Sequence, residues 1–156
     1  CEVHKITRRL NIPLIINDRI DVAAAIGAEG VHLGQEDLTI GSARKMLGES
    51  AIIGISTHTQ YEAQTAEYAG ADYIGVGTVF PTASKKDIIG IIGTTGLKAI
   101  CDVVKIPVVA IGGINQSNIR EVMACQVAGV AVISAIGQSD NPRESARILK
   151  KMTSSH

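Results

Sequence analysis

Aromatic side chains are scarce in this chain: they make up 3% of its 156 residues, and there is no tryptophan. The sequence is nevertheless 46% apolar, because isoleucine, valine, alanine and other non-aromatic residues take the place of the larger rings. Small and β-branched residues pack well around buried parallel strands that are covered by helices. The composition therefore favours a single α/β domain over residues 1–156, long enough to bury a substantial core.

An excess of charge of either sign is also missing. Fifteen Lys and Arg residues balance fifteen Asp and Glu residues, so no overall field would attract nucleic acid or an anionic membrane surface. No apolar run approaches the ~20 residues that cross a bilayer. We therefore expect neither nucleic acid nor a membrane as a partner, and we interpret the basic pair Lys150–Lys151 as part of a solvated face.

Cysteine is sparse, with three residues and no CxxC motif. An odd number without metal-ligand spacing argues against a disulfide framework or a zinc site, and free thiols favour a cytoplasmic protein. The chain begins at Cys1 instead of Met, and residues 2–10 have the pattern of a helix. From this we expect the first part of the domain to be missing from the sequence.

Short apolar segments alternate with amphipathic ones along the whole chain. The predicted strands are 13–17, 30–34, 52–56, 73–77, 107–112 and 130–135. The predicted helices are 22–26, 40–47, 60–69, 95–104, 118–127 and 142–152. Thr39, Thr59 and Ser117 are expected to cap three of these helices. The Gly27-Ala28 and Gly70-Ala71 pairs are expected to end two others and lead directly into strands.

This alternation predicts a parallel sheet with right-handed crossovers, and the near copies GAEGVHLG and GADYIGVG indicate repeated βα units. An open doubly wound sheet and a closed barrel both fit. We favour the TIM (β/α)₈ barrel because no strand is followed by a GxGxxG turn. A complete barrel has roughly 250 residues, so the first two βα units are expected to be missing. The edge strands 13–17 and 130–135 should then lack a partner, which favours pairing with another chain and a homo-oligomer.

Small residues end the last two predicted strands, in the sequences AIGGI (110–114) and VISAI (132–136). The loops after strands 7 and 8 of such barrels commonly form a phosphate site. Gly112 and Gly113 would let the backbone approach a phosphate, and Ser134 would add a hydroxyl. The alternative is that these glycines only permit tight turns.

Polar side chains also follow the first two predicted strands. Asn17 and Asp18 come directly after the first, and Asp37 follows the second. Neighbouring parallel strands lie roughly 4.8 Å apart, so the two carboxylates can converge on one ion. Mg²⁺ prefers oxygen ligands and completes its shell with water and phosphate oxygens. The alternative for Asp18 is that it caps the next helix.

Ser56 ends the third predicted strand, and His58 follows two residues later. A Ser near a His can form a nucleophile, but the sequence offers no third partner for such a pair. A hydroxyl at a strand end more often binds a phosphate oxygen, which is the role we expect for Ser56. We expect His58 to be a structural or substrate-binding residue and not a general base.

The longest predicted loop, residues 77–93, contains the stretch PTASKK. Its residues Thr82, Ser84 and Lys85 place two hydroxyls and an ammonium close together, which suits a chain of phosphates. A loop of this length inside a compact domain is usually functional or disordered. The alternative is a solvated polar flap.

Taken in order, these motifs closely resemble the thiamine-phosphate synthase family over residues 11–137. The matching segments are IINDR, GVHLGQED, GISTH, YIGVGTVFPTASKK, PVVAIGGI and GVAVISAI. The resemblance implies a Mg²⁺-dependent transferase that couples 4-amino-5-hydroxymethyl-2-methylpyrimidine diphosphate to a thiazole phosphate. The products would be thiamine phosphate and pyrophosphate. The segments GTVF and IIGTTGL resemble the fungal version, in which this domain is fused to a hydroxyethylthiazole kinase.

The resemblance also implies roles for single residues. Asn17 would bind the pyrimidine diphosphate, and Asp18 and Asp37 would bind Mg²⁺. Ser56 and Lys85 would contact the diphosphate and are the expected catalytic residues. The residues expected to hold the thiazole phosphate are Thr82, Ala83, Ser84, Gly113, Ile133 and Ser134.

The chain departs from the family pattern in two places. The family favours Thr where this chain has Ser84, a change that keeps the hydroxyl. The family's Gln-x-Arg-x-Lys stretch, which contacts the pyrimidine diphosphate, has no counterpart here, so the 156-residue chain is expected to be at most weakly active. Two alternatives stay open: a thiazole tautomerase with His58 as its base, and an inactive phosphate-binding fragment.

Overall fold

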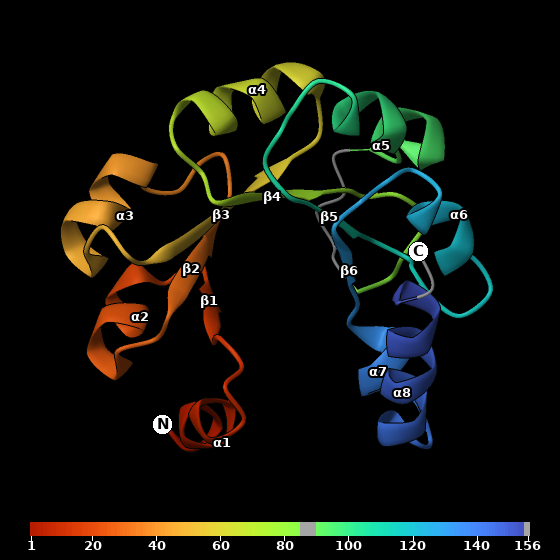
Figure 1. The fold of residues 1–156 in the computed structure, drawn as a ribbon, viewed down its shortest axis with the longest axis horizontal. Coiled ribbons are helices and arrows are strands. Elements are labelled where there is room, and N and C mark those ends of the chain that lie inside the picture. The colour runs from red at the N-terminus through yellow and green to blue at the C-terminus, as the bar shows by residue number, and fades with distance from the viewer. Residues whose placement is uncertain (85–89, 155–156) are drawn as a thin grey trace.

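The computed structural model describes residues 1–84 and 90–154. Its centre is a single parallel sheet in which six strands follow one another in the order of the chain. The strands are β1 (Ile15–Asn17), β2 (Gly30–Leu33), β3 (Ile52–Thr57), β4 (Tyr73–Val76), β5 (Val108–Ile111) and β6 (Gly129–Ala131). The sheet curls into an arc with helices along its outer side, and α1 and α8 lie at its two ends (Figure 1). The register pairs Asn17 with His32 and Ser56 with Gly75.

Helices connect the strands, and the predicted threonine caps of two of them are confirmed. The hydroxyls of Thr39 and Thr59 accept hydrogen bonds from the backbone N–H groups of Ser42 and Glu62, which satisfies donors that a helix start leaves open. The predicted cap Ser117 is wrong, because Asn118 occupies that position. The helices are α1 (Glu2–Arg9), α2 (Ile20–Ile26), α3 (Ile40–Leu47), α4 (Gln60–Tyr68), α5 (Gly93–Cys101), α6 (Ile119–Met123), α7 (Ser134–Gly137) and α8 (Pro142–Thr153).

The last predicted strand is the least accurate. It was expected over 130–135, but β6 ends at Ala131 and the short helix α7 begins at Ser134. Periodicity cannot separate a strand from a helical turn in a short apolar run such as VISAI. The predicted helix ends Gly27 and Gly70 are confirmed, since both glycines have positive φ, 63° and 88°.

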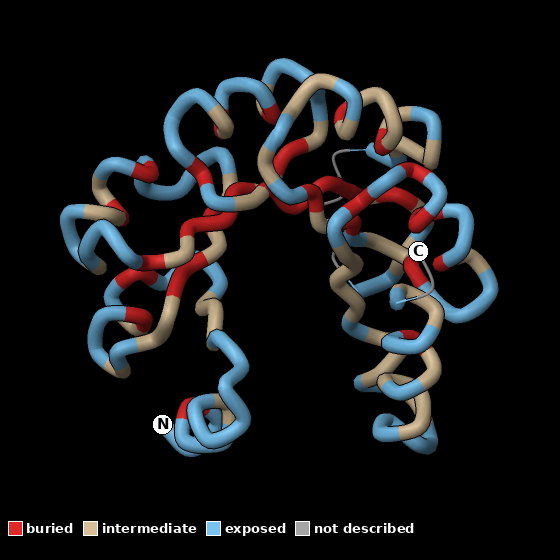
Figure 2. The backbone as a smooth tube through the Cα atoms, viewed as in Figure 1, coloured by how far each residue is buried: buried red, intermediate tan, exposed pale blue. Residues whose placement is uncertain are grey.

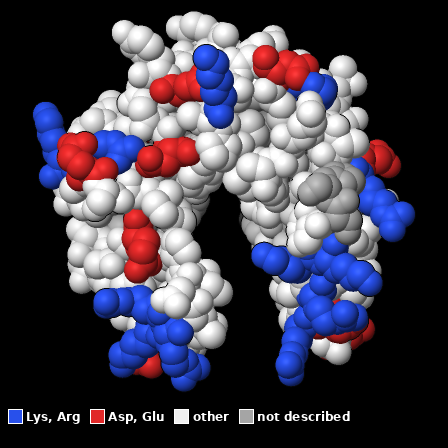
Figure 3. All heavy atoms as spheres, viewed as in Figure 1, with Lys and Arg blue, Asp and Glu red and all other residues white. Residues whose placement is uncertain are grey.

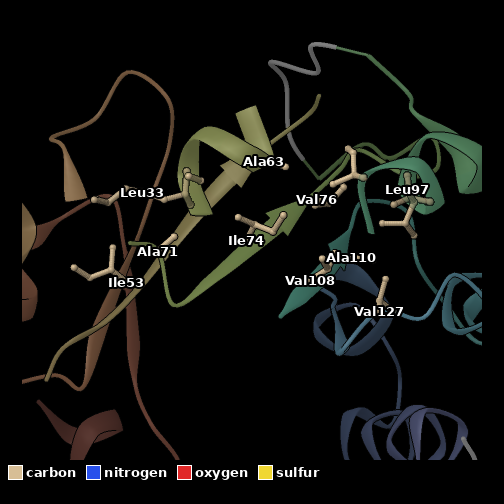
Figure 4. Packing of buried hydrophobic residues seen from close by; sticks show 14 of the residues in the cluster. Leu33, Ile53, Ala63, Ala71, Ile74, Val76, Leu97, Val108, Ala110 and Val127 are labelled. Atoms are coloured by element: carbon tan, nitrogen blue, oxygen red, sulfur yellow. The ribbon is translucent and has the colours of Figure 1, made fainter. Parts of the chain in front are cut away.

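The hydrophobic core lies between the sheet and its outer helices. Ile53, Ile74 and Val76 from the strands pack in one cluster with Ala63 and Leu97 from α4 and α5 (Figure 4). Figure 2 shows this burial following the strands and the helix sides that face them. Because successive strand residues point to opposite faces, the alternate residues are left on the inner side of the arc. That inner side is where polar side chains can meet.

The arc is a six-stranded half-barrel that is consistent with the predicted TIM-like fold, and it is open in the described residues. β1 pairs only with β2, and β6 pairs only with β5. The strands at the two ends of the chain are therefore the sheet edges, as the sequence predicts. The closed eight-unit barrel is not shown.

Basic side chains gather at the two ends of the arc. Figure 3 shows Lys and Arg over α1 at one end and over α8 at the other. Arg8 and Arg9 lie in the last turn of α1, and Lys150 and Lys151 in the last turn of α8, where cations interact favourably with the helix dipole. In the described part of the chain, every helix is too short or too polar to cross a membrane.

Helix α1 is attached to the sheet through a histidine–carboxylate pair. The buried His4 places Nδ1 3.0 Å from the carbonyl oxygen of Ile26 and Nε2 3.0 Å from Oε1 of Glu29. The other oxygen of Glu29 accepts a 2.8 Å hydrogen bond from the backbone N–H of Leu14. Glu29 therefore joins α1, the start of β1 and the α2–β2 turn.

These bonds predict how acid affects stability. Mainly because of the hydrogen bond from His4, and secondarily that from Leu14, the pKa of Glu29 is lowered from 4.5 to about 2. A depressed carboxyl pKa stabilises the fold fully above pH 4.5, and this contribution is lost as pH falls towards 2. We expect Glu29→Gln to be less stable than the wild type at pH 7 and to lose less stability over that range, as measured by urea unfolding at each pH. Equal acid sensitivity of both proteins would contradict the assignment; Glu49→Gln, in an exposed turn, is the control.

Candidate active site

A cavity of about 540 Å³ opens on the inner side of the arc and extends to the carboxyl ends of the strands. All six strands, or the residues that directly follow them, contribute to its wall. Residues from the strands, before their carboxyl ends, are Ile15, His32, Tyr73, Gly75 and Val109. Those at or beyond the strand ends include Asn17, Ser56, Thr57, His58, Gly77, Thr78, Ile111, Gly112 and Gly113. Ligands of parallel α/β folds bind at this end of the sheet.

Most of the residues predicted from the sequence meet in this one cavity. Those that line it are Asn17, Ser56, Thr82, Ser84, Gly113, Ile133 and Ser134. Ala83, between Thr82 and Ser84, is exposed and is not among the lining residues. Lys85 lies outside the described residues. The predicted set therefore comes together from β1, β3, the β4–α5 loop and the ends of β5 and β6.

The two predicted metal ligands are not among the residues that line this cavity. Asp18 directly follows β1, and its backbone N–H donates a 2.8 Å hydrogen bond to the carbonyl oxygen of His32. Its alternative role is wrong: the N-cap position of α2 is Arg19, with no side-chain cap. Asp37 follows β2, and its Oδ2 accepts a 2.7 Å hydrogen bond from the N–H of Gly34. Both carboxylates are exposed.

The donor set suits a cation that receives its other ligands from a substrate. Within residues 1–84 and 90–154, no three Asp, Glu, His or Cys side chains gather into a group that could hold a metal ion. Asp18 and Asp37 nevertheless follow neighbouring parallel strands, and Mg²⁺ is commonly bound by one or two carboxylates together with phosphate oxygens and water. These two residues could therefore hold Mg²⁺ in the presence of a diphosphate.

A hydrogen-bonded chain that sequence reasoning missed crosses the inner side of the sheet. His32 on β2 places Nδ1 2.9 Å from the hydroxyl oxygen of Tyr73 on β4, and Nε2 2.9 Å from Oγ of Ser56 on β3. The His32 and Tyr73 rings lie 5.4 Å apart between centroids. Burial raises the pKa of the Tyr73 phenol, so this hydroxyl stays protonated. The histidine partner of Ser56 is therefore His32, not its sequence neighbour His58.

Two glycines make this chain of side chains possible. A Cβ atom at Gly54 would lie 2.1 Å from the Tyr73 ring, and a Cβ atom at Gly75 would lie 2.8 Å from Cε1 of His32. Any other residue at these positions would push the rings off the sheet. The only signal in the sequence was the presence of Gly54 and Gly75 inside two predicted strands. Hydrophobic periodicity does not distinguish such glycines from those in turns.

His58 has the structural role expected for it. Its backbone N–H donates a 2.6 Å hydrogen bond to Oε2 of Glu62, and its Nδ1 lies 3.3 Å from the same oxygen. These contacts join the end of β3 to the first turn of α4.

The glycine pair after β5, Gly112 and Gly113, lies directly against the backbone of the β4–α5 loop. The N–H groups of Val79 and Phe80 donate hydrogen bonds of 3.0 Å to the carbonyl oxygens of Ile111 and Gly112. A Cβ atom at Gly113 would lie 2.5 Å from the carbonyl oxygen of Pro81, and the φ of Gly113 is 63°. Gly113 therefore allows the backbone of the loop that carries Thr82 and Ser84 to approach closely. The approach of a phosphate at this position stays a prediction.

Comparison with known proteins assigns a chemistry to this geometry. The family described as Thiamine monophosphate synthase matches residues 1–136. The chain is 53% identical over 148 residues to a thiamine-phosphate synthase of Clostridium novyi, covering 95% of this chain and 72% of that protein. It is 46% identical over 153 residues to a thiamine-phosphate synthase of Chloroflexus aurantiacus, covering 98% and 70%. These relatives are bacterial, and they do not support the expected kinase fusion.

Solved structures agree with this comparison. A thiamine phosphate pyrophosphorylase from Pyrococcus furiosus superposes with a TM-score of 0.87 at 44% identity, covering 96% of this chain and 71% of that one. A 3-hexulose-6-phosphate synthase from Salmonella typhimurium superposes with a TM-score of 0.77 at 17% identity, covering 99% and 79%. At that identity, the second similarity shows the fold alone.

Proposed function

The chain belongs to the thiamine monophosphate synthase family, and from this premise we propose how its cavity divides between two substrates. The activity is that of a thiamine-phosphate synthase, which joins a pyrimidine diphosphate to a thiazole phosphate and releases pyrophosphate. The observation that carries our division is that one cavity is lined both by residues of β1 and β3 and by residues that follow β5 and β6. Identities of 46% and 53% to synthases favour this coupling over the tautomerase alternative.

The pyrimidine diphosphate occupies the β1–β3 side in this proposal. Asn17 offers an amide at the end of β1, and Ser56 offers a hydroxyl at the end of β3. Both can donate hydrogen bonds to phosphate oxygens, and hydrogen bonds to ionised acceptors are the stronger kind. Lys85 would add an ammonium from the β4–α5 loop, an assignment that rests on the family resemblance.

The thiazole phosphate occupies the β5–β6 side. Gly113, Ile133 and Ser134 line this part of the cavity, and Thr82 and Ser84 face it from the β4–α5 loop. The backbone N–H of Ser84 donates a 3.2 Å hydrogen bond to the Thr82 hydroxyl, which keeps this part of the loop folded together. Ala83 contributes at most backbone atoms, since its side chain is not part of the lining.

Asp18 and Asp37 hold Mg²⁺ together with the diphosphate in this proposal. When bound, the ion would neutralise the leaving group and orient it. The residues of the chain then hold the two substrates in line, exclude water and stabilise negative charge as pyrophosphate departs. An aminopyrimidine can stabilise the positive charge left on its methylene carbon, and the thiazole nitrogen attacks that carbon. No acid–base pair is needed for this sequence.

We propose that the complete fold is a closed barrel. Two further βα units would pair with the free edges of β1 and β6 and close an eight-unit barrel. The family's Gln-x-Arg-x-Lys stretch would reach the diphosphate from one of these units. We propose a cytoplasmic homo-oligomer; the kinase fusion has no support beyond the resemblance and is not included.

Paired alanine variants test the division of the cavity. Ser56→Ala is expected to raise the KM for the pyrimidine diphosphate by about tenfold and to leave the KM for the thiazole phosphate nearly unchanged, because one hydrogen bond to a charged group is lost. Ser134→Ala should show the opposite preference, and Lys85→Ala should follow Ser56→Ala. Steady-state kinetics with each substrate varied in turn measure both constants. Equal damage to both substrates from either variant would refute the division.

A further inference from the structure

We infer that His32 is a positioning residue that holds the Ser56 hydroxyl as a hydrogen-bond donor towards the leaving diphosphate, with Tyr73 holding His32 in the required tautomer. This inference rests on the proposed function, since it takes the diphosphate as the ligand of Ser56. Its basis in the structure is the chain of three side chains from three neighbouring strands. The distances are 2.9 Å from Tyr73 to His32 and 2.9 Å from His32 to Ser56.

The direction of the hydrogen bonds decides what Ser56 can do. If Nδ1 of His32 carries the proton, it donates to Tyr73; Nε2 then accepts the Ser56 proton, and Ser56 presents only lone pairs to the cavity. If Nε2 carries the proton, Tyr73 donates to Nδ1, Nε2–H donates to Ser56 Oγ, and the Ser56 hydroxyl hydrogen is available to a ligand. An anionic ligand selects the second arrangement, because lone pairs would repel it.

The surroundings support this arrangement. Tyr73 is half-buried and stays protonated, so it can serve as the donor to Nδ1. The backbone carbonyl of Ser56 accepts a 2.6 Å hydrogen bond from the Gln35 side chain, which fixes the end of β3. In the described part of the chain, the Ser56 hydroxyl makes no hydrogen bond besides that to His32, so its second position faces the cavity. Among the described lining residues, the titratable side chains are His32, His58 and Tyr73.

The glycines on the inner side give this arrangement its geometry. With no Cβ atom at Gly75, the His32 ring can lean across the sheet from β2 towards β4 and pass within reach of Ser56 on the intervening strand. With no Cβ atom at Gly54, the Tyr73 ring can lean back towards the His32 ring. The two rings therefore meet above β3, beside Ser56 near the end of the strand.

Two amide substitutions separate the hydrogen bond from the packing of the ring. The side-chain nitrogen of Gln falls near the position of Nε2 in His, whereas that of Asn falls near Nδ1. His32→Gln therefore keeps a donor to Ser56, and His32→Asn removes it. Both variants lose the imidazole ring and similar packing. If His32 had only a structural role, the two substitutions would therefore weaken binding equally.

The experiment measures the dissociation constant of magnesium pyrophosphate by calorimetry in the whole encoded protein. We expect Ser56→Ala and His32→Asn each to weaken binding by about tenfold, as for loss of one hydrogen bond to a charged group. His32→Gln should bind magnesium pyrophosphate within about threefold of the wild type. Tyr73→Phe should bind more weakly than His32→Gln but more tightly than His32→Asn, because it keeps Nε2 of His32 and removes only the donor that fixes the tautomer. The double variant with Ser56→Ala and His32→Asn should be no weaker than Ser56→Ala alone, since the two residues act through one bond.

Three results would overturn the inference: wild-type affinity in His32→Asn, equal weakening in both His32 variants, or additive losses in the double variant. Thermal unfolding of each variant checks that it folds. If His32→Asn does not fold, the affinity of His32→Gln relative to the wild type is the test. Failure of the proposed function looks different. In that case Ser56→Ala itself binds pyrophosphate like the wild type, and the assignment of Ser56 to the diphosphate is lost.

Discussion

Replacing Asp37 by alanine is expected to lower kcat/KM by about 10²-fold or more, the loss typical of removing one preorganised electrostatic group. The carboxylate follows β2, one strand from Asp18, and both are exposed. If they share a Mg²⁺ ion through the substrate diphosphate, loss of one ligand weakens both metal binding and neutralisation of the leaving group. Turnover measured across a Mg²⁺ titration gives the size of the effect.

The structure shows how to separate this effect from a folding defect. Oδ2 of Asp37 accepts a hydrogen bond from the Gly34 N–H, which alanine would also remove. Asp37→Asn keeps an oxygen for that bond while it removes the charge, so we expect it to retain the wild-type melting temperature and to lose activity nearly as alanine does. Glu36→Ala, an exposed acidic residue beside it, is the control and should be active. Turnover like the wild type in Asp37→Asn at saturating Mg²⁺ would remove Asp37 from the metal site.

Replacing Gly113 by alanine is expected to reduce kcat/KM for the thiazole phosphate by about 10²-fold, because small displacements of positioning groups are costly. The new Cβ atom would lie 2.5 Å from the carbonyl oxygen of Pro81 and 2.7 Å from that of Phe80. Neither backbone oxygen can move without moving the loop that carries Thr82 and Ser84. The thiazole side of the cavity should therefore be damaged more than the pyrimidine side.

Gly27 provides a matched control for the backbone strain. Its φ is 63°, the same as that of Gly113, but no atom lies within 4 Å of the position that its Cβ would take. Alanine costs about 1 kcal/mol in this left-handed conformation at either site. We therefore expect Gly27→Ala to be slightly destabilised and fully active, whereas Gly113→Ala loses activity as well. If both variants have equal kcat/KM, contact with the loop is not what matters at Gly113.

The order of the elements could be predicted from the sequence because each βα unit carries its own signals. Thr39 and Thr59 cap their helices through contacts only three residues long, and the Gly27 and Gly70 turns depend on local φ alone. Residues at the carboxyl ends of parallel strands share one edge of the sheet. That rule was sufficient to place Asn17, Ser56 and Gly113 around one cavity.

What could not be predicted depends on contacts across strands. The hydrogen bonds of His32 reach residues 24 and 41 positions away. They also require that two residues on neighbouring strands, Gly54 and Gly75, have no Cβ atom on the face where the rings lie. Ser117 failed as a cap for a different, local reason: Asn118 takes the N-cap position, where it accepts from the N–H of Asn115 and donates to the carbonyl oxygen of Gly113. Neither arrangement leaves a periodic signal in the sequence.

The strand order has a consequence for local unfolding. Because every strand pairs only with its neighbours in sequence, an outer unit of the described chain can open without breaking the pairing of the units behind it, as in repeat proteins. Asn17 and Asp18 lie on such an outer unit, whereas Ser56 lies in the middle of the sheet. A ligand held by both must therefore keep the outer unit closed, and the free energy of that closure is subtracted from its affinity. Occupancy of the cavity and hydrogen-exchange protection of β1 should accordingly rise and fall together.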